Sequence, residues 1–267
     1  EKVADFDRRW KRLPTVACTH CGLLYTNPMP DEAELSHYYE KYYRFDYQLA
    51  SSKPTRKHRF HSERLAQARA ANLKGLIKPG GKTLDFGCGS GEFVGRMASL
   101  GYDAKGFEPG ETYGSAARER LGERIILGRW QDQAFGPEFD LVSCFHVVEH
   151  LRNPMEAIAA MLSWLAPEGR IYIEVPDLGS RPYRGIGGYH FAHVLAFNTF
   201  NLKLAAALHG LVPVREFEKT GILFERGTPE NPGLLAEKGR ELTWAIHAGH
   251  SPVKQYVMHS LRLAPRK

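Results

Sequence analysis

The stretch Thr83-Leu-Asp-Phe-Gly-Cys-Gly-Ser-Gly-Glu-Phe93 decides the fold, because a short apolar run ends in an acid and then in three glycines at every second position. This order predicts a strand that turns tightly into a helix. Gly87, Gly89 and Gly91 remove side chains where the backbone must approach a ligand, and glycine accepts the positive φ that such a turn needs. The acid before the loop, Asp85, would repel a pyrophosphate and suits a cation such as the ammonium group of an amino acid.

Strand and helix patterns alternate along the chain around this loop. The expected helices are 56–77, 91–100, 111–121, 155–165, 199–209 and 234–247, and the expected strands are 83–86, 104–107, 125–127, 141–145, 171–175, 212–217 and 255–263. Alternating β and α units predict a parallel sheet with both faces covered. In such sheets, ligands bind at the carboxyl ends of strands, near the point where the strand order reverses. Asp85, Glu108 and His146 all lie at such ends, so we expect them to converge on one crevice.

Four segments resemble, in the right order, the class I S-adenosylmethionine-dependent methyltransferases. Residues 84–91 resemble the first motif of that family, and residues 102–108 form a strand that ends in an acid about 20 residues further on, where the ribose hydroxyls are bound. Residues 139–154 and 165–176 resemble the fourth strand with its loop and the next helix end, turn and strand. The resemblance implies an α/β fold with a Rossmann-like, seven-stranded, doubly wound sheet whose final strand is antiparallel. It also implies S-adenosylmethionine (SAM) as the cofactor.

The resemblance further assigns cofactor contacts to residues of this chain. Glu108 would accept both ribose hydroxyls, and Phe145 and His146 would border the sulfonium. The residues implied beside the methionine part are Asp85, Gly87, Cys88, Gly89 and Gly91. Those implied beside the adenine are Pro109, Gly110, Trp130 and Gln131, with Asp132 as the alternative to Gln131.

Histidines near the carboxyl ends of the later strands are candidates for a general base. Methyl transfer is an in-line displacement, so the protein aligns the reactants and supplies a base where the acceptor needs one. His146, His190 and His193 titrate near neutral pH and are the candidate catalytic residues. We expect His190 or His146 to be the base, and the resemblance gives His193 a role in organising its loop.

Residues 1–55 differ in character from residues 56–267 and predict a small N-terminal cap on the methyltransferase domain. The stretch 31–47 is rich in tyrosine at helical spacing. It is either a helix that simply packs on the sheet domain or a lid over the cofactor crevice, which the resemblance favours. The residues expected to bind the acceptor are Tyr39, Tyr43, Arg44, Tyr183, Tyr189 and His190.

Cys18 and Cys21 form a Cys-x-x-Cys-Gly sequence in this cap, the spacing with which two thiolates bind zinc. Two thiolates are only half of a tetrahedral site. Methyltransferases of small molecules and sugars that resemble this chain carry a second such pair upstream, whereas this sequence has none ahead of Cys18. The alternatives are therefore a zinc ion on Cys18 and Cys21, or the ordinary reduced cysteines of a cytoplasmic protein.

The segment His146-Val-Val-Glu-His150 matches the H-x-x-E-H pattern of one class of zinc proteases. That pattern needs both histidines on one face of a helix. Because His146 follows a buried strand and Asn153-Pro154 interrupts the segment soon after His150, we expect no such helix. Glu149 and His150 then shape the loop, and the alternative is a divalent ion shared with the substrate.

Charge and composition limit the partners. The net charge of +6 allows an acidic or phosphorylated substrate, but the basic residues are spread out, with the densest clusters at 8–12 and 53–64, so no nucleic-acid partner is expected. No run approaches the ~20 apolar residues of a membrane span, and the charged start has no apolar signal segment. The expectation is a cytoplasmic protein that acts on a small molecule, in an oligomeric state that the sequence leaves open.

These observations predict a SAM-dependent methyltransferase that methylates oxygen or nitrogen, with carbon less favoured, of a small molecule such as a sugar or a natural-product intermediate. One alternative is an RNA methyltransferase, which needs a clustered cationic surface. The other is a non-catalytic module that binds SAM or S-adenosylhomocysteine (SAH) and carries a remnant of a zinc knuckle. Asp85, Glu108 and the intact glycine loop argue against this module, because a site without chemistry does not need them.

Overall fold

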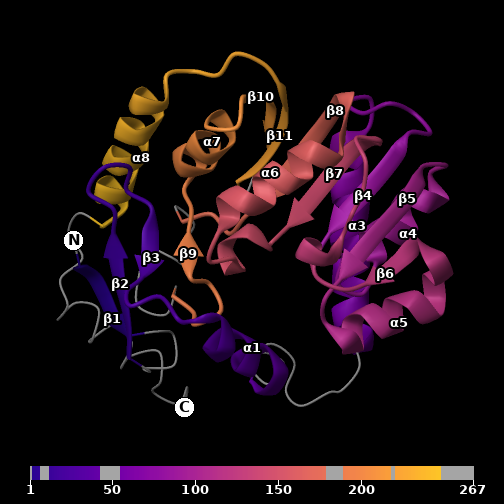
Figure 1. Cartoon of the computed structure of the whole chain (residues 1–267), viewed down its shortest axis with the longest axis horizontal. Helices are drawn as coiled ribbons and strands as arrows, with labels where there is room; N and C mark the ends of the chain where they lie inside the picture. Colours follow the sequence, from indigo (N-terminus) through magenta and orange to yellow (C-terminus); the bar gives the residue numbers. More distant parts are fainter. Residues whose placement is uncertain (1, 7–11, 43–54, 179–188, 218–219, 248–267) are drawn as a thin grey trace, which may run out of the picture.

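The computed structural model describes residues 2–6, 12–42, 55–178, 189–217 and 220–247 (Figure 1). Several expectations therefore lie outside the described residues: those for Tyr43, Arg44 and Tyr183 and the strand at 255–263. The described strands form two sheets, one of seven strands and one of four.

The seven-stranded sheet has the order β10-β11-β8-β7-β4-β5-β6. Its strands are β4 (Lys82–Phe86), β5 (Asp103–Glu108), β6 (Ile125–Leu127), β7 (Phe139–Phe145), β8 (Leu165–Glu174), β10 (Leu211–Phe217) and β11 (Gly221–Arg226). Strands β4 to β8 run parallel to one another, and β11 runs antiparallel to both β8 and β10. The predicted Rossmann-like sheet with an antiparallel final strand is confirmed.

The residues that form this final strand differ from those that the sequence predicted. The seventh place in the sheet was expected for residues 255–263, but β11 takes it. β11 follows β10 after a very short connection, in which Thr220 adopts a φ of 59°. At Gly221 a Cβ atom would meet the hydroxyl of Tyr172 on β8, so only a glycine lets the new strand begin so close to its neighbour.

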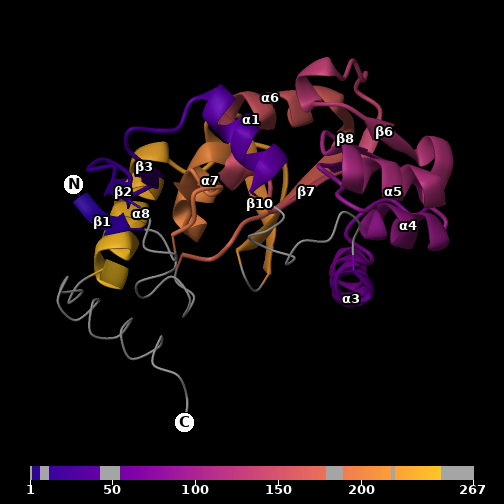
Figure 2. The same cartoon turned by 90° about the horizontal axis from the view of Figure 1, so that it is seen from below.

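Helices cover both faces of the large sheet, so it is doubly wound as predicted. They are α3 (Arg56–Leu73), α4 (Glu92–Ser99), α5 (Glu111–Leu121), α6 (Pro154–Trp164) and α7 (Thr199–Ala207). Figure 2 shows α6 on one face and α3 with α4 on the other. One buried cluster joins the strands to α6 and α7 through Ile158, Met161 and Leu202, and a second joins them to α3 and α4 through Leu73 and Val94. None of the helices in the described ranges combines the length and apolar character that a membrane crossing requires.

The N-terminal segment contains a small antiparallel sheet that was not predicted. It consists of β1 (Lys2–Phe6), β2 (Arg12–Ala17), β3 (Leu24–Thr26) and, from much later in the chain, β9 (Leu195–Ala196). The turn between β2 and β3 packs against α8 (Pro232–His247), as Figure 1 shows. Thr243 donates a hydrogen bond to the carbonyl of Gly22 (2.8 Å) and Asn201 to that of Cys21 (2.6 Å). The cap is thereby tied to the C-terminal half of the described chain.

The tyrosine-rich stretch forms α1 (Glu32–Lys41). The Asp31 side chain accepts a hydrogen bond from the N–H of Glu34, and the Glu34 carboxylate accepts one from the N–H of Asp31, which is a capping box. Leu35 and Tyr38 are buried, whereas 48% of Tyr42 is exposed. The apolar face of the helix is therefore shorter than the tyrosine spacing predicts, and it ends before Tyr42.

Candidate active site

The glycine loop after β4 has the predicted conformation. Gly87, Gly89 and Gly91 have φ values of 72°, 54° and 78°. A Cβ atom would meet Val147 at 2.8 Å on Gly87 but nothing within 4 Å on Gly89, so the backbone of Gly89 borders open space. Cys88 is buried with its side chain against Gly106, and burial raises the pKa of its thiol. The loop can therefore offer backbone, rather than the Cys88 thiol, to a ligand.

Asp85 lies at the end of β4, between β5 and β7, which is the point where the strand order reverses. Only 4% of this residue is exposed, and Ser143 on β7 donates a 2.8 Å hydrogen bond to its carboxylate. Burial raises the pKa of Asp85 to about 7, although the Ser143 hydrogen bond and the Arg69 charge act in the opposite direction. A cation bound here would favour the ionised form.

Glu108 at the end of β5 is held by the backbone of two loops. Its carboxylate accepts hydrogen bonds from the N–H of Gly89 (3.0 Å) and from the N–H of Gly110 (2.8 Å), where α5 begins. Burial raises the pKa of Glu108, and the two N–H donors counteract that shift. The carboxylate is thus oriented at the glycine loop, as expected for a group that binds a sugar diol.

His146 follows β7 in a left-handed conformation with a φ of 55°. Its Nε2 lies 3.1 Å from Glu174 and its Nδ1 lies 3.5 Å from Glu149. Loss of hydration lowers the pKa of His146, but the two carboxylates outweigh this effect and raise it to about 9. A raised pKa favours the protonated imidazole, which has no lone pair to receive a proton, and the role of His146 as a base stays a prediction.

Two residues of the site were missed by sequence reasoning. Glu174 at the end of β8 accepts a bidentate pair from Arg69 of α3, with Nη2 and Nε at 2.6 and 3.1 Å. The guanidinium also lies 4.1 Å from the centre of the Phe145 ring. An acid at the end of a parallel strand, as at Asp85, was a signal for Glu174, whereas no local pattern pointed to Arg69.

The cap helix α1 reaches the loop after β7. The Tyr39 hydroxyl lies 2.7 Å from Nδ1 of His150, and the Tyr38 hydroxyl lies 3.2 Å from Nε2 of His190. Burial lowers the pKa of His150. Both contacts fit a helix that packs on the sheet domain as well as a lid, so the lid interpretation stays a prediction.

Of the remaining histidines, His190 is 3% exposed and both of its ring nitrogens have partners. Nδ1 accepts from the N–H of Ala192 at 3.1 Å, and Nε2 faces Tyr38. The ring of His193 packs edge-on against that of His150, with centroids 4.7 Å apart. These contacts give both side chains a structural role, and their catalytic roles stay predictions.

The other predicted residues were expected either beside the adenine or at the acceptor. Trp130 begins the 3-10 turn η2 (Trp130–Asp132), and the centre of its ring lies 6.3 Å from that of Phe86. Pro109 and Gln131 are exposed. Asp132 pairs with Arg129 at 3.3 Å. Tyr189, expected at the acceptor, instead packs in the core of the small sheet, with its hydroxyl 2.7 Å from His247 of α8.

Cys18 and Cys21 are both free thiols in the turn between β2 and β3. Within the described ranges, no third histidine, cysteine or acid lies close enough to complete a metal site with them. Zinc at this pair therefore stays a prediction. The H-x-x-E-H segment contains only one turn of 3-10 helix, η3 (Val148–His150), and His146 lies outside it, so the two histidines do not share a helix face.

Comparison with known proteins agrees with this fold. A family model described as a methyltransferase domain matches residues 56–216, and the chain belongs to that family. The ubiquinone biosynthesis O-methyltransferase of Photobacterium profundum is 32% identical over 111 residues, which cover 39% of this chain and 47% of that protein. The enzyme of the same name from Aromatoleum aromaticum is 26% identical over 68% of this chain and 77% of its own length. The chain thus spans about half the length of some of its curated relatives.

Solved structures show the same fold. A SAM-dependent methyltransferase of Thermotoga maritima aligns with a TM-score of 0.52 at 18% identity, over 73% of this chain and 99% of its own. The magnesium protoporphyrin IX methyltransferase of Synechocystis, solved with bound SAH, aligns with a TM-score of 0.51 at 18% identity, over 74% of this chain and all of its own. The large sheet therefore has the class I methyltransferase fold.

Proposed function

We propose that this chain is a SAM-dependent methyltransferase that methylates an oxygen of a small molecule. The family membership supports methyl transfer, and the O-methyltransferase names of the curated relatives favour oxygen over nitrogen. The resemblance of the glycine loop to the SAM motif supports the cofactor.

The observation that carries the proposal is the orientation of Glu108. Its carboxylate sits at the glycine loop, already aligned by the N–H groups of Gly89 and Gly110. Charge-assisted hydrogen bonds from two ribose hydroxyls to such a carboxylate are stronger than neutral ones. The buried carboxylate of Asp85 fits the ammonium of the methionine part, and the open space at Gly89 lets a ligand approach the backbone.

Bound SAM supplies an activated methyl group on a positively charged sulfur. The residues of this chain then have to align an acceptor oxygen and favour its deprotonated form. Phenolic hydroxyls, with a pKa of about 10, lose their proton far more readily than the hydroxyls of sugars, so we infer that the acceptor is a phenol. Tyr38 and Tyr39 of the cap helix contact His190 and His150, and as parts of a lid they would keep water from the acceptor.

The test is a methyl-transfer assay on the purified chain with methyl-labelled SAM. Matched acceptors share one benzene ring and carry a hydroxyl pair, a single hydroxyl or an amine, and a sugar serves as a further comparison. We expect label in the hydroxylated rings, equal amounts of SAH and labelled product, and little label in the amine or the sugar. Label that enters only the amine, or no transfer to any acceptor by protein that binds SAM, would overturn the assignment to oxygen of a phenol.

A further inference from the structure

Glu149 in the turn η3 is a buried acid to which the described part of the chain donates no hydrogen bond. The residue is 1% exposed, and neither carboxylate oxygen has a hydrogen-bond partner among the described residues. Oε1 lies 3.5 Å from Nδ1 of His146 and 3.7 Å from Nε2 of His150, beyond the usual hydrogen-bond distance. Burying a carboxylate in this way is costly unless a cation or donors compensate it.

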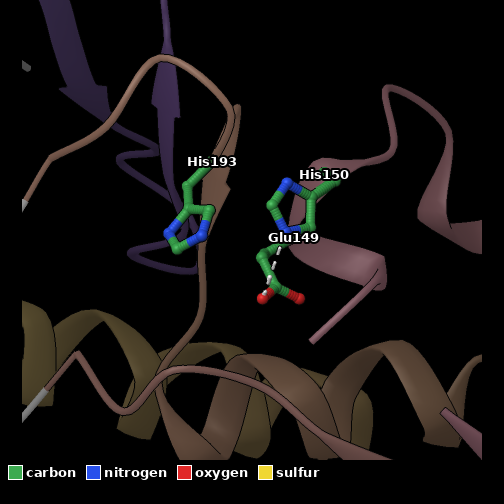
Figure 3. A group of neighbouring side chains, drawn as sticks. All are labelled: Glu149, His150 and His193. Atoms are coloured by element: carbon green, nitrogen blue, oxygen red, sulfur yellow. Dashed lines mark ion pairs between the residues drawn. The ribbon is translucent and has the colours of Figure 1, made fainter. Parts of the chain in front are cut away.

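Two histidines stand beside this carboxylate. Figure 3 shows the rings of His150 and His193 side by side next to Glu149. One ligand atom from each of the three side chains lies within 4.8 Å of the other two. Ligands at 2.0–2.2 Å from a tetrahedral zinc ion lie roughly 3.4 Å apart. The 3.7 Å between Glu149 and His150 is already close to that separation, so small side-chain movements suffice to place an ion between them.

The surroundings of His150 match those of a metal-binding imidazole. Its Nδ1 lies 2.9 Å from the carbonyl oxygen of Ala192 and 2.7 Å from the hydroxyl of Tyr39. A proton on Nδ1 that is donated to Ala192 leaves the lone pair on Nε2, which is the nitrogen that faces Glu149. Metal-bound histidines characteristically donate their other ring N–H to a carbonyl or carboxylate in this way.

We propose that Glu149, His150 and His193 bind a divalent transition-metal ion, with zinc as the best match. Two imidazoles and one carboxylate suit zinc and its neighbours, whereas magnesium and calcium prefer oxygen ligands. The ion compensates the buried carboxylate and links the loop after β7 to the segment just before β9. Three protein ligands leave a fourth position, which water or a substrate oxygen occupies in catalytic zinc sites.

The test is calorimetric titration of the chelator-treated full chain with zinc. Cys18 and Cys21 are the other zinc candidates, so the experiment uses the double variant Cys18→Ser/Cys21→Ser as the background in which the new site is measured. We expect this background to retain zinc binding. In it, Glu149→Gln and His193→Ala should each weaken binding at least tenfold, and Tyr39→Phe should weaken it less, because Tyr39 only braces His150.

SAH binding by the same samples, measured in parallel, reports folding and is separate from the metal. Variants that bind SAH normally but have lost zinc support the proposal. It is overturned if the folded cysteine-free background binds no zinc, or if Glu149→Gln and His193→Ala bind zinc as the background does. Cobalt provides a second readout, because its visible absorption reports a tetrahedral site and should disappear in His193→Ala.

Discussion

Arg69 of α3 and Glu174 at the end of β8, 105 positions apart in sequence, form a bidentate ion pair at 2.6 and 3.1 Å. Their side chains are only 14% and 10% exposed. The pair fixes the helix that precedes the glycine loop against the strand end beside His146. Glu174 thereby connects the first helix of the methyltransferase domain to the expected acceptor side of the site.

Replacing Arg69 by methionine should destabilise the protein strongly. The change keeps most of the side-chain volume but leaves the Glu174 carboxylate buried without its guanidinium, a loss of about 3–5 kcal/mol for pairs of this kind. Urea unfolding of both proteins measures the difference. The exposed pair of Arg118 and Glu123 offers a matched control, because Arg118→Met should change the free energy of unfolding by less than about 1 kcal/mol.

The same carboxylate predicts a loss of stability in acid. Burial would raise the pKa of Glu174, but His146 and Arg69 outweigh it and lower the pKa from 4.5 to about 2. A folded-state pKa below the unfolded one stabilises the protein above the unfolded pKa, and the contribution is lost as pH falls from about 4.5 towards about 2. The stability difference between wild type and Glu174→Gln should therefore shrink over this window. A difference that is constant with pH would contradict the ion-pair assignment.

Glu108→Ala should weaken the binding of SAH while leaving the fold intact. Each charge-assisted hydrogen bond to the carboxylate is worth about 1.5–3 kcal/mol, so the dissociation constant should rise at least tenfold. Glu119→Ala, on the exposed surface of α5, is the control and should bind as the wild type does. Unchanged affinity in Glu108→Ala would refute the ribose assignment.

Cofactor binding should strengthen as pH rises towards 7. Burial raises the pKa of Asp85 to about 7, so below that pH the ammonium of the ligand must displace a proton from the carboxyl group. Calorimetry at pH 6 in two buffers with different ionisation enthalpies should detect proton release on binding. In Asp85→Asn the release should vanish and the affinity should become nearly independent of pH between 6 and 7.

The large sheet was predictable because its signals are local. The glycine loop fixed the turn after β4, and α5 and β6 have the predicted bounds. β11 was missed because its short apolar run follows β10 so closely that the sequence shows no separate strand. The contact of Arg69 with Glu174 was missed because a pair so far apart in sequence leaves no periodic pattern. The burial of Glu149 likewise depends on η3 and the segment before β9 meeting in space.

The first measurement to make is a calorimetric titration of the purified chain with SAM, SAH and NAD. Glu108 and Asp85 at a G-x-G-x-G loop should bind SAM and SAH with dissociation constants on the order of micromolar, corresponding to about −8 kcal/mol. NAD should not bind, because Asp85 repels its pyrophosphate. A folded sample that binds NAD, or that binds neither SAM nor SAH, would contradict the proposed function.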